Sequence, residues 1–490
     1  MRRNGEPDRI VVIGGGISGL SSAFYLLREA KRRGRDVRVT IVEAMDRVGG
    51  KINTLRRDGF VIERGPDSFL ARKKPIIDLA MDLGIEQQLT GTNPAAKKTY
   101  ILHRRKLHPM PQGLVLGIPT EIAPFAKTGL LSFGAKMRAM LDFVMPARAA
   151  EGDESLGSFL SRRLGPEVME RVAEPLLAGI YAGDLSKLSL QATFPQFGAA
   201  ERKHGSLIRG MRANRGKTPA IAANASELPS SARTPFLTFK GGLATMVGEL
   251  ERALTGYEVE FRLGTKVEGI EKVEDGAKGQ EQGAYRVMLD GGVTIEADGV
   301  VITTPAFHAA SLLEPYVKVD AIRAVNYVSV ANVVMAFDKA SLGGYQFDGS
   351  GFVIPRSEGT TITACTWTSS KWLHSSPDDK VLLRCYVGRA GDEAVVDLPD
   401  AQLKEAVRAD VRSIMGITAE PLFTEITRLH HSMPQYPVGH LERTAQLRAE
   451  MAKALPGVWV TGAAFDGVGL PDCIRQGKQA AVSLLDGLEG

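Results

Sequence analysis

The chain has 490 residues, of which 44% are hydrophobic and 24% are charged, and this ordinary globular composition excludes disordered and collagen-like proteins. The formal net charge of +5 is small for this length and does not indicate a nucleic-acid-binding protein. At about 150 residues per domain, the length predicts two or three domains.

The number of cysteines and the N-terminal sequence indicate the cellular compartment in which the protein is expected. Cys365, Cys385 and Cys473 are few and far apart in sequence, which argues against a disulfide framework and a cysteine-based zinc site. The start, MRRNGEPDRI, has no apolar signal core, and no stretch of 18 uncharged apolar residues occurs. We therefore expect a cytoplasmic protein with no metal site, no transmembrane helix and at most peripheral membrane contact.

The N-terminal part predicts a βαβ unit followed by a short helix. Residues 9–13 (RIVVI) and 37–44 (VRVTIVEA) form apolar strands, and residues 20–33 between them have helical periodicity. A short helix is expected within 75–92.

The middle of the chain predicts mostly helical structure, followed by a loop, a further helix and short strands. Residues 93–190 predict mostly helix, with the clearest helices at 135–145 and 154–164. Residues 213–235 are rich in Ala, Ser, Asn and Pro and predict an exposed loop. A helix within 240–254 follows, and several short strands come after it.

The C-terminal part predicts strands around one helix. Residues 300–306 (VVITTPA) form a buried strand, and apolar segments at 328–337, 361–368 and 381–387 have the character of antiparallel strands. A helix is expected at 401–415, and the chain closes with a strand, a glycine loop and a helix. Because nucleotide-fold segments occur at the start, in the middle and at the end, we predict one discontinuous nucleotide-binding domain with two insertions.

Gly14, Gly16 and Gly19 form the pattern G-x-G-x-x-G between the first strand and the first helix. The first glycine permits a tight turn, the second lets the backbone approach a pyrophosphate, and the third allows close helix–strand packing. Glu43, at the end of the second strand, stands where a ribose hydroxyl needs a carboxylate acceptor. The pattern predicts a dinucleotide site without separating NAD from FAD.

The residues after Glu43 favour FAD. Arg47, Gly50 and Lys51 continue the motif as E-x-x-x-R-x-G-G-K, in which the cation can reach the pyrophosphate and the glycines let the main chain follow a flat ring. No second G-x-G-x-x-G occurs, which argues that the substrate gives its hydride directly to the flavin. The C-terminal loop GAAFDGVGLPDC precedes a helix whose positive end favours a reduced, anionic flavin.

At these residues the chain resembles the flavin amine oxidase superfamily from end to end, and within it the porphyrinogen oxidases. It is most similar to the coproporphyrinogen III oxidase type of Gram-positive bacteria. The stretches that carry the resemblance are RVGGKINT (47–54), ERGPDSFLARKK (63–74), LHPMP (107–111), EPLLAGIYAGD (174–184), FPQF (194–197), ACTWTSSKW (364–372), SMPQYPVGH (432–440) and GVGLPDCI (467–474).

The resemblance implies an α/β (α+β) fold like that of p-cresol methylhydroxylase. This fold has a discontinuous Rossmann-like FAD domain, a mixed-sheet substrate domain and an inserted helical domain that touches the membrane in membrane-bound relatives. The implied bounds are 1–75, 236–304 and 425–490 for the FAD-binding domain, 76–94, 191–235 and 305–424 for the substrate-binding domain, and 95–190 for the helical domain.

The resemblance also implies noncovalent FAD. Relatives carry a tryptophan where this chain has Leu429, so one stacking contact to FAD is expected to be missing. Together with the motifs, the candidate cofactor-binding residues are Gly14, Gly15, Gly16, Ile17, Ser18, Gly19, Glu43, Ala44, Arg47, Gly50, Lys51, Gly65, Pro66, Asp67, Ser68, Val267, Val468, Gly469 and Leu470.

Five residues are candidates for the substrate pocket. Arg72 and Lys73 follow the flavin-side segment and can pair with a substrate carboxylate, with Lys73 favoured. Ile180, Tyr181 and Tyr386 are candidates for the walls of a flat apolar slot. No indispensable catalytic base is predicted, because an aromatic product makes the oxidation downhill.

The implied activity is FAD-dependent oxidation of coproporphyrinogen III to coproporphyrin III in haem biosynthesis, with dioxygen as acceptor and hydrogen peroxide as product. Protoporphyrinogen IX is expected as a further substrate and a ferrochelatase as a transient partner, whereas no nucleic acid is expected. Two alternatives stay open: another flavin oxidase acting on an amine or a polyene, and a flavin-binding scaffold without enzymatic activity.

Overall fold

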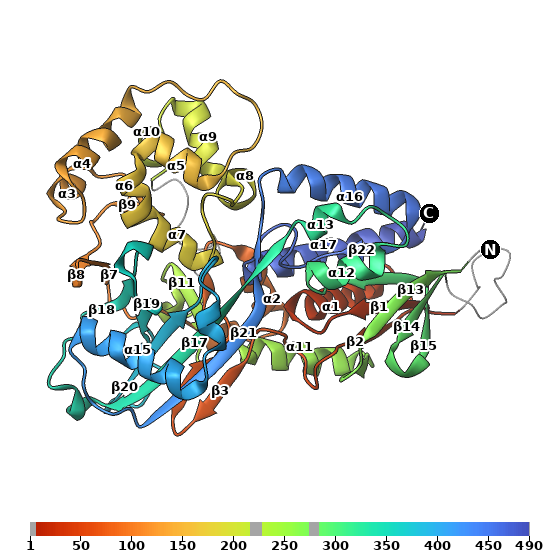
Figure 1. The fold of residues 1–490 in the computed structure, drawn as a ribbon. Helices are drawn as coiled ribbons and strands as arrows, with labels where there is room; N and C mark the ends of the chain where they lie inside the picture. Colours follow the sequence, from red (N-terminus) through yellow and green to blue (C-terminus); the bar gives the residue numbers. More distant parts are fainter. Residues whose placement is uncertain (1–5, 216–227, 274–283, 490) are drawn as a thin grey trace.

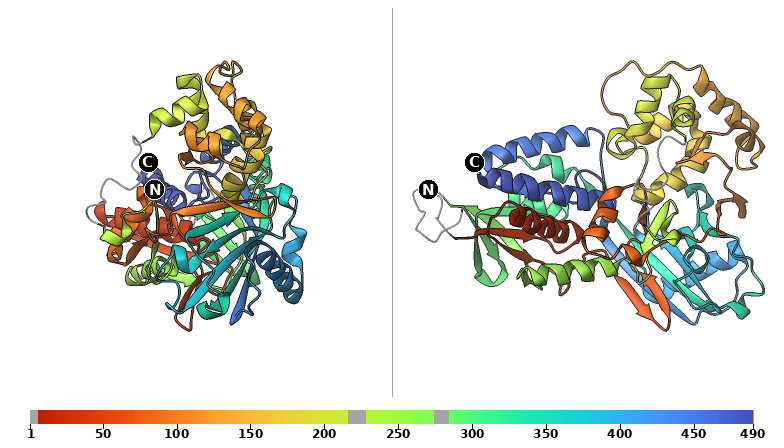
Figure 2. Two further views of the ribbon diagram at one scale, coloured as in Figure 1. Left: turned by 90° about the vertical axis from the view of Figure 1, so that its left-hand side faces the viewer. Right: turned by 180° about the vertical axis from the view of Figure 1, so that it is seen from behind.

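Two large sheets and a group of helices make up the protein (Figure 1). The structure is a computed structural model that describes residues 6–215, 228–273 and 284–489. One group of helices and the larger sheet lie at one end, and the smaller sheet, with helices of its own, lies at the end where residues 6 and 489 are found (Figure 2). Most of the predicted loop at 213–235 falls outside the described residues.

A five-stranded parallel sheet brings together segments from the start, the middle and the end of the chain. Alternate residues of the central strand face opposite layers: Ile10 and Val12 pack into one apolar cluster, and Val11 and Ile13 into the other. A strand covered on both faces reads as a continuous apolar run, as RIVVI does. The order is β12 (Glu260–Arg262), β2 (Val37–Val42), β1 (Asp8–Ile13), β16 (Gly299–Ile302) and β22 (Val458–Val460).

Helices cover one face of this sheet, and helices with a small antiparallel sheet cover the other. On the first face, α1 (Ile17–Arg32) packs closely on α17 (Leu470–Glu489), because Gly477 has no side chain to meet Ser21. This face also carries α11 (Ala244–Gly256) and α2 (Lys74–Asp82). The second face carries α12 (Ala306–Leu313), α13 (Asp320–Arg323), α16 (His440–Ala454) and the sheet of β13 (Val267–Lys272), β14 (Tyr285–Leu289) and β15 (Thr294–Ala297).

A seven-stranded mixed sheet forms the second large layer. All of its pairs are antiparallel except β18 with β7. Helix α15 (Asp400–Met415) covers one face through Leu403, Val407 and Val411, which recur every four residues. The order is β21 (Phe423–Gln435), β17 (Asn326–Asp338), β20 (Lys380–Val387), β19 (Ile362–Trp367), β18 (Gly349–Val353), β7 (Lys98–His103) and β8 (Lys106–Pro109).

Two cysteines that are far apart in sequence lie opposite each other in this sheet. Cys365 of β19 pairs in register with Cys385 of β20, and both are buried free thiols in the layer under α15. A hydrogen bond with the neighbouring Cys365 thiol, together with burial, raises the pKa of Cys385 well above its usual value. The Cys385 thiol is therefore an uncharged packing group at neutral pH.

Short strands and two further small sheets join the large layers. The hairpin of β3 (Thr54–Arg57) and β4 (Phe60–Glu63) packs on the seven-stranded sheet through Phe60 and Ile62. The three-stranded sheet is β5 (Phe69–Leu70), β11 (Phe236–Phe239) and β6 (Leu89–Gly91), and the two-stranded sheet is β9 (Leu114–Val115) with β10 (Ile118–Pro119).

A helical part sits above the seven-stranded sheet, at the upper left of Figure 1. Its helices share one apolar cluster that extends from Ile101 to Met211 and includes Tyr436. They are α3 (Ile122–Lys127), α4 (Phe133–Met140), α5 (Leu156–Leu164), α6 (Pro166–Val168), α7 (Glu174–Tyr181), α8 (Leu190–Thr193), α9 (Pro195–His204) and α10 (Leu207–Asn214).

The expectation of mostly helix over 93–190 is wrong for its first part, where β7 to β10 occupy residues 98–119. Strand β7 adds to the edge of the seven-stranded sheet, so a partner about 250 residues away decides its conformation. The helices expected near 135–145 and 154–164 are present as α4 and α5. The division into three domains stays a prediction.

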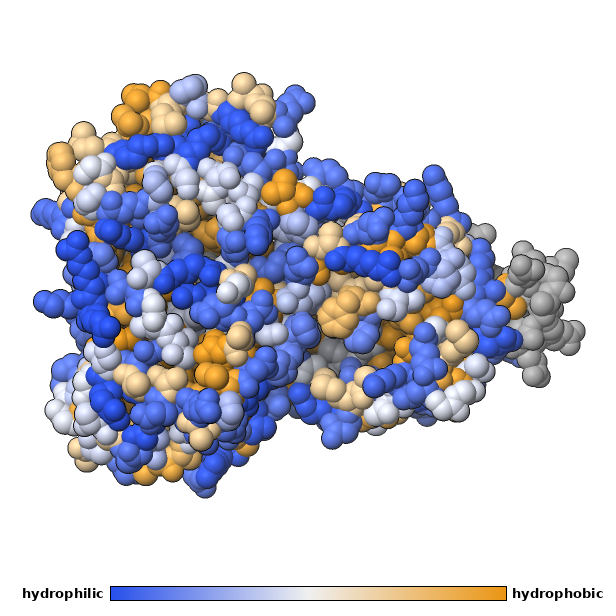
Figure 3. Space-filling view, viewed as in Figure 1, coloured by the Kyte–Doolittle hydropathy of each residue, from blue (hydrophilic) through white to orange (hydrophobic). Residues whose placement is uncertain are grey.

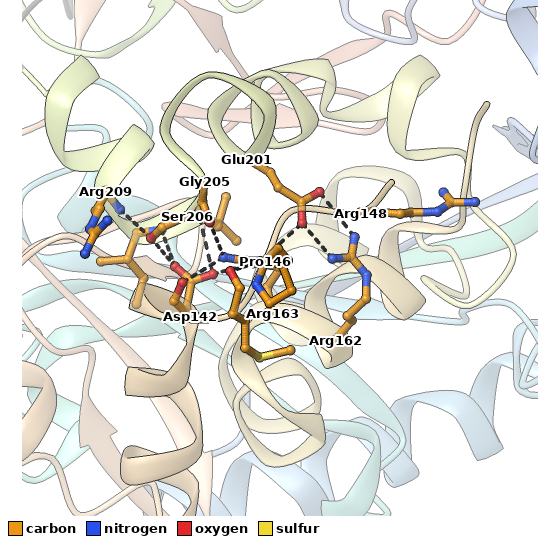
Figure 4. Close-up of polar contacts among 12 residues, drawn as sticks. Asp142, Pro146, Arg148, Arg162, Arg163, Glu201, Gly205, Ser206 and Arg209 are labelled. Atoms are coloured by element: carbon orange, nitrogen blue, oxygen red, sulfur yellow. Dashed lines mark hydrogen bonds and ion pairs between the residues drawn. The ribbon is translucent and has the colours of Figure 1, made fainter. Parts of the chain in front are cut away.

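Buried ion pairs hold the helical part together (Figure 4). Asp142 and Arg163 are fully buried, and the Arg163 Nε donates a 2.5 Å hydrogen bond to Asp142. Asp142 also accepts hydrogen bonds from the Ser206 hydroxyl and from the backbone N–H groups that begin α10. Glu201 joins the network by accepting from both Arg162 and Arg163. Each buried charge thus has a partner of opposite sign, which burial requires.

The surface mixes hydrophilic and apolar patches on the face shown in Figure 3, including apolar side chains over the helical part. Phe133, Met137, Leu141 and Val144 are exposed along α4 and the turn that follows it. Within residues 6–215, 228–273 and 284–489, no helix has the length and apolar character needed to cross a bilayer.

Candidate active site

The glycine turn after β1 is closely packed at Gly19 and open at Gly16. Gly14 adopts the left-handed φ of 107°, and its N–H donates to the Val42 carbonyl at 2.8 Å. A Cβ on Gly19 would lie 1.9 Å from the Gly14 carbonyl oxygen, whereas a Cβ on Gly16 would have no heavy atom within 4 Å. The space in front of Gly16, at the N-terminus of α1, is therefore free for a ligand. Ile17 and Ser18 begin that helix.

Glu43 is tied to the same turn. Its buried carboxylate accepts hydrogen bonds from the Gly15 N–H at 2.6 Å and from the Met45 N–H at 2.9 Å. The Thr265 N–H donates to the Glu43 carbonyl at 3.0 Å, which places the start of β13, with Val267, beside Glu43 and Ala44. The structure thus brings these predicted residues to one edge of the parallel sheet.

The loop that carries Arg47 to Lys51 packs against the glycine turn, with the Gly49 N–H donating to the Gly15 carbonyl at 2.8 Å. Arg47 donates to the carbonyls of Val48, Gly50 and Ile52, so its guanidinium shapes this loop. The predicted contact of Arg47 with a pyrophosphate stays a prediction.

The Lys51 ammonium points away from that loop toward the seven-stranded sheet. It donates to the Ser432 carbonyl of β21 and lies 6.0 Å from the centre of the Tyr327 ring. Lys51 as a whole is exposed, but protein closely surrounds its ammonium group, and this desolvation lowers the pKa of Lys51 to about 8. The ammonium therefore loses its proton more easily than a fully solvated lysine does.

The segment from Gly65 to Ser68 lies between the two sheets. A Cβ on Gly65 would lie 1.8 Å from the Lys51 carbonyl oxygen, so only glycine fits there. Arg384 of β20 donates to the Gly65 carbonyl. Burial alone would raise the pKa of Asp67, but Lys371 and Arg384 outweigh it and lower the pKa to about 2. Pro66 and Ser68 complete the segment.

The C-terminal glycine loop closes the site from the opposite side. The Gly467 N–H donates to the hydroxyl of the buried Tyr436 at 3.1 Å. Val468 packs against the cluster of the helical part, and Leu470 packs against the cluster of the parallel sheet. Gly469 lies between them and accepts a hydrogen bond from the Asp472 N–H at 2.9 Å. The loop therefore lies where the two parts meet.

Three buried hydroxyls around this space have no hydrogen-bond partner in the structure. They belong to Thr304, which follows β16, to Thr461, which follows β22, and to Ser432 of β21. The carboxyl ends of β16 and β22 flank that of β1, where dinucleotides bind in sheets of this kind. The unpartnered hydroxyls of Thr304 and Thr461, at this edge of the sheet, fit a polar dinucleotide that supplies their partners.

The substrate candidates differ in placement. Lys73 forms an ion pair with Asp472, the second residue after the glycine loop, which joins the segment before α2 to the start of α17. Tyr181 is buried, and its ring lies 6.0 Å from that of Tyr436. Arg72 and Ile180 are exposed. The structure thus links Lys73 and Tyr181 to the glycine loop. It does not link Arg72 or Ile180 to that loop.

Tyr386 lies on β20, two residues from Arg384, and the Arg384 guanidinium stacks 4.9 Å from its ring centre. Its hydroxyl lies 3.4 Å from the Thr366 hydroxyl. Leu429 is partly exposed on β21, opposite Val330.

Three residues of this site were not found from the sequence. Asp472 and Tyr436 act through contacts between segments that are far apart, and no local pattern marks them. Arg384 could have been found, because the period of two along a strand places it on the same face as Tyr386.

The sequence pattern of one family covers nearly the whole chain. The family described as flavin-containing amine oxidoreductase matches residues 17–485. The chain belongs to this family. As a member of the flavin-containing amine oxidoreductases, the protein is an oxidoreductase and a flavoprotein.

Full-length relatives are similar throughout the chain. It is 48% identical to coproporphyrinogen III oxidase of Bacillus subtilis, over 97% of both chains. It is 41% identical to coproporphyrinogen III oxidase of Staphylococcus aureus, over 97% of this chain and 98% of that one. Against the chloroplastic protoporphyrinogen oxidase of Nicotiana tabacum the identity is 30%, over 96% and 84%.

Solved structures agree with the fold. A protein of Exiguobacterium sp. 255-15 that carries a provisional protoporphyrinogen oxidase name is 38% identical, with a TM-score of 0.85 over 99% of this chain and 100% of that one. A putrescine oxidase structure is 15% identical with a TM-score of 0.68 over 98% and 99%, which shows a shared fold. The predicted α/β fold with a flavin-binding Rossmann-like part is confirmed.

Proposed function

We propose that this protein uses noncovalently bound FAD to oxidise coproporphyrinogen III to coproporphyrin III in haem biosynthesis. Dioxygen is the proposed acceptor, hydrogen peroxide the proposed co-product, and protoporphyrinogen IX a further substrate. The observation that carries the proposal is the 48% identity to a coproporphyrinogen III oxidase over 97% of both chains. A cytoplasmic location and a transient contact with a ferrochelatase belong to the same proposal.

The proposed reaction balances over three two-electron steps. In each step the macrocycle loses a hydride from a bridge carbon and a proton from a pyrrole nitrogen. A bound flavin supplies the hydride acceptor, and dioxygen takes two electrons and two protons per step to become hydrogen peroxide. The protein's main task is to hold one bridge carbon in place, because alignment lowers the barrier of a downhill reaction.

The residues proposed to hold the flavin line the space described above. The open face of Gly16 and the start of α1 receive the pyrophosphate, and Glu43 receives the ribose. Gly65 to Ser68 and Val468 to Leu470 border the ring from two sides. The unpartnered hydroxyls of Thr304, Thr461 and Ser432 support a polar ligand at this place.

Lys73 is proposed to bind a propionate of the substrate. Its side chain is 39% exposed and is anchored by Asp472 at the start of α17, just after the glycine loop. An ammonium has three N–H donors, so Lys73 can donate to Asp472 and to a substrate carboxylate at the same time. Tyr181 and Tyr386 are proposed as walls of the slot, whereas Arg72 and Ile180 are proposed at its rim.

The experiment that tests the function follows absorbance, porphyrin fluorescence and peroxide release with both porphyrinogens under air. We expect porphyrin and hydrogen peroxide to appear together. Peroxide release with spermidine but not with coproporphyrinogen would select an amine oxidase instead. A flavin that stays oxidised under anaerobic porphyrinogen would point to a binding scaffold.

The role of Lys73 has its own test. Lys73→Ala should raise KM for the tetra-acid coproporphyrinogen, because a lost charge-assisted hydrogen bond is worth about 1.5–3 kcal/mol, or roughly tenfold to a hundredfold. The effect on the di-acid protoporphyrinogen should be smaller. Lys74→Ala, which removes the exposed neighbouring lysine, is the control. Equal effects on both substrates would remove Lys73 from this role.

A further inference from the structure

A small, partly enclosed cavity lies behind the segment from Gly65 to Ser68. Its volume is about 20 Å³. Its walls come from β4 and the residues after it, from β11, β17 and β20, and from α14 (Thr368–Lys371) and the residues that follow it. A polar cavity of more than about 10–15 Å³ can hold a water molecule if two to four polar groups face it. The volume therefore suits one water molecule.

Three lining side chains carry a buried polar atom without a partner. These atoms are the Trp372 Nε1, the Thr238 Oγ1 and the Arg384 Nε, and the three residues are 3%, 2% and 4% exposed. The indole and guanidinium N–H groups can only donate, so their missing partner must be an acceptor. A buried donor without a partner destabilises the fold, so an occupied cavity is more stable than an empty one.

Glu63 faces the same cavity and already uses both carboxyl oxygens as acceptors. Oε1 accepts from the Leu243 N–H at 2.6 Å, and Oε2 accepts from the Thr54 hydroxyl at 2.9 Å. The residue as a whole is partly exposed, yet its carboxyl is closely surrounded, and burial raises the pKa of Glu63 to about 7. Near neutral pH the carboxyl is thus often protonated, and its O–H then needs an acceptor.

The other titratable groups around the cavity do not compete for this proton. Lys371 and Arg384 hold Asp67 ionised, with a pKa of about 2. Burial, with a contribution from Lys240, lowers the pKa of His374 to about 4, so the imidazole is neutral. Ionised Asp67 favours, and Arg384 opposes, protonation of Glu63. Near neutral pH, Glu63 is therefore the group in this cavity that changes charge.

We propose that the cavity holds an ordered water molecule and that Glu63 and this water form a proton-binding site behind the segment proposed to contact the flavin. The water accepts hydrogen bonds from the Trp372 N–H, the Arg384 N–H and the protonated Glu63 carboxyl, two of them at a time. When Glu63 ionises, the water donates to its carboxylate instead. A monatomic anion is disfavoured, because Asp67 and ionised Glu63 both face the cavity. The proposal does not depend on which substrate the enzyme oxidises.

Infrared titration of the holoenzyme tests the proton. We expect the band of a protonated carboxyl to disappear with a midpoint near pH 7 and to be absent from Glu63→Gln. Thr54→Val should move the midpoint upward, because it removes a hydrogen bond that stabilises the carboxylate. Thr54→Ser keeps the hydroxyl and should leave the midpoint in place. A band that persists unchanged in Glu63→Gln would overturn the assignment, even with a fully active enzyme.

A high-resolution crystal structure of the holoenzyme tests the water. We expect density within hydrogen-bond distance of both the Trp372 Nε1 and the Thr238 Oγ1, and weaker density in Trp372→Phe. No density in a crystal that shows other buried waters would overturn the proposal. Strong anomalous density after a bromide soak would also overturn it, because the site would then bind anions.

Discussion

Replacing Gly16 and Gly19 separates cofactor binding from folding, because the two glycines face different surroundings. Gly16 has φ −72° and ψ 179°, which any residue can adopt, and a Cβ there meets nothing within 4 Å. In the absence of flavin, Gly16→Ala should leave stability unchanged or raise it by about 0.4–1 kcal/mol, because it restricts the unfolded chain. Gly19→Ala places a Cβ 1.9 Å from a backbone oxygen and should cost about 1–3 kcal/mol or more.

Added flavin should make the wild type more stable than the Gly16 variants, although without flavin the Gly16→Ala protein is at least as stable as the wild type. At a concentration of 100 times Kd, a ligand stabilises the folded protein by about 2.7 kcal/mol. Gly16→Val fills the space proposed for the pyrophosphate, so this gain should vanish and the purified protein should be colourless. The assay compares thermal unfolding with and without added FAD, together with the flavin content of the purified protein. A Gly16→Val protein that keeps full flavin and the full gain would refute the placement of the cofactor.

Three further predictions concern other parts of the molecule. Asp142→Ala should lower the free energy of unfolding by about 3–5 kcal/mol, because it leaves the buried Arg163 guanidinium without its carboxylate; a loss below 1 kcal/mol in urea titrations would contradict this. The pKa of His374 is about 4 in the folded protein and 6.5 in the unfolded chain, so the unfolded chain binds this proton more readily. The free energy of unfolding should therefore fall as the pH drops from 6.5 to 4, by about 3 kcal/mol in total. In His374→Gln this share of the acid sensitivity should disappear from urea unfolding measured at the two pH values, and an unchanged pH dependence would speak against it. Leu429→Trp should tighten FAD binding up to about tenfold if a ring at this position stacks on the flavin, and an unchanged Kd in fluorescence titrations of the apoprotein would show that it does not.

Local patterns predicted those parts of the fold that local chemistry determines. RIVVI and the three glycines predicted the first strand, the turn and the helix, because burial on both faces and a crowded turn leave few alternatives. The helix expected at 401–415 is likewise present as α15, in which the buried Leu403, Val407 and Val411 recur every four residues. Strand β21 was missed, because its sequence FTEITRLHHSMPQ contains few apolar residues and its conformation depends on pairing with β17.

The candidate site was predictable where one motif contains it and not where distant segments meet. The Glu43 carboxylate and the glycine turn lie within one βαβ unit, and their neighbourhood follows from that unit. Lys73 and Asp472 are 399 residues apart, so no spacing rule could pair them. The cavity beside Glu63 is still less visible in sequence, because strands from four regions of the chain form its walls.

The strand order of the parallel sheet has a consequence for how the protein is made. The glycine turn leaves the ribosome among the first residues, but β16, β22 and the loop at 467–470 that complete the cleft come hundreds of residues later. The helical part, whose cluster runs mainly through residues 101–211, is already synthesised by then and can fold ahead of them. A nascent chain halted before residue 458 lacks β22 and the loop at 467–470, so with the flavin at the proposed site we expect such a chain to hold no cofactor.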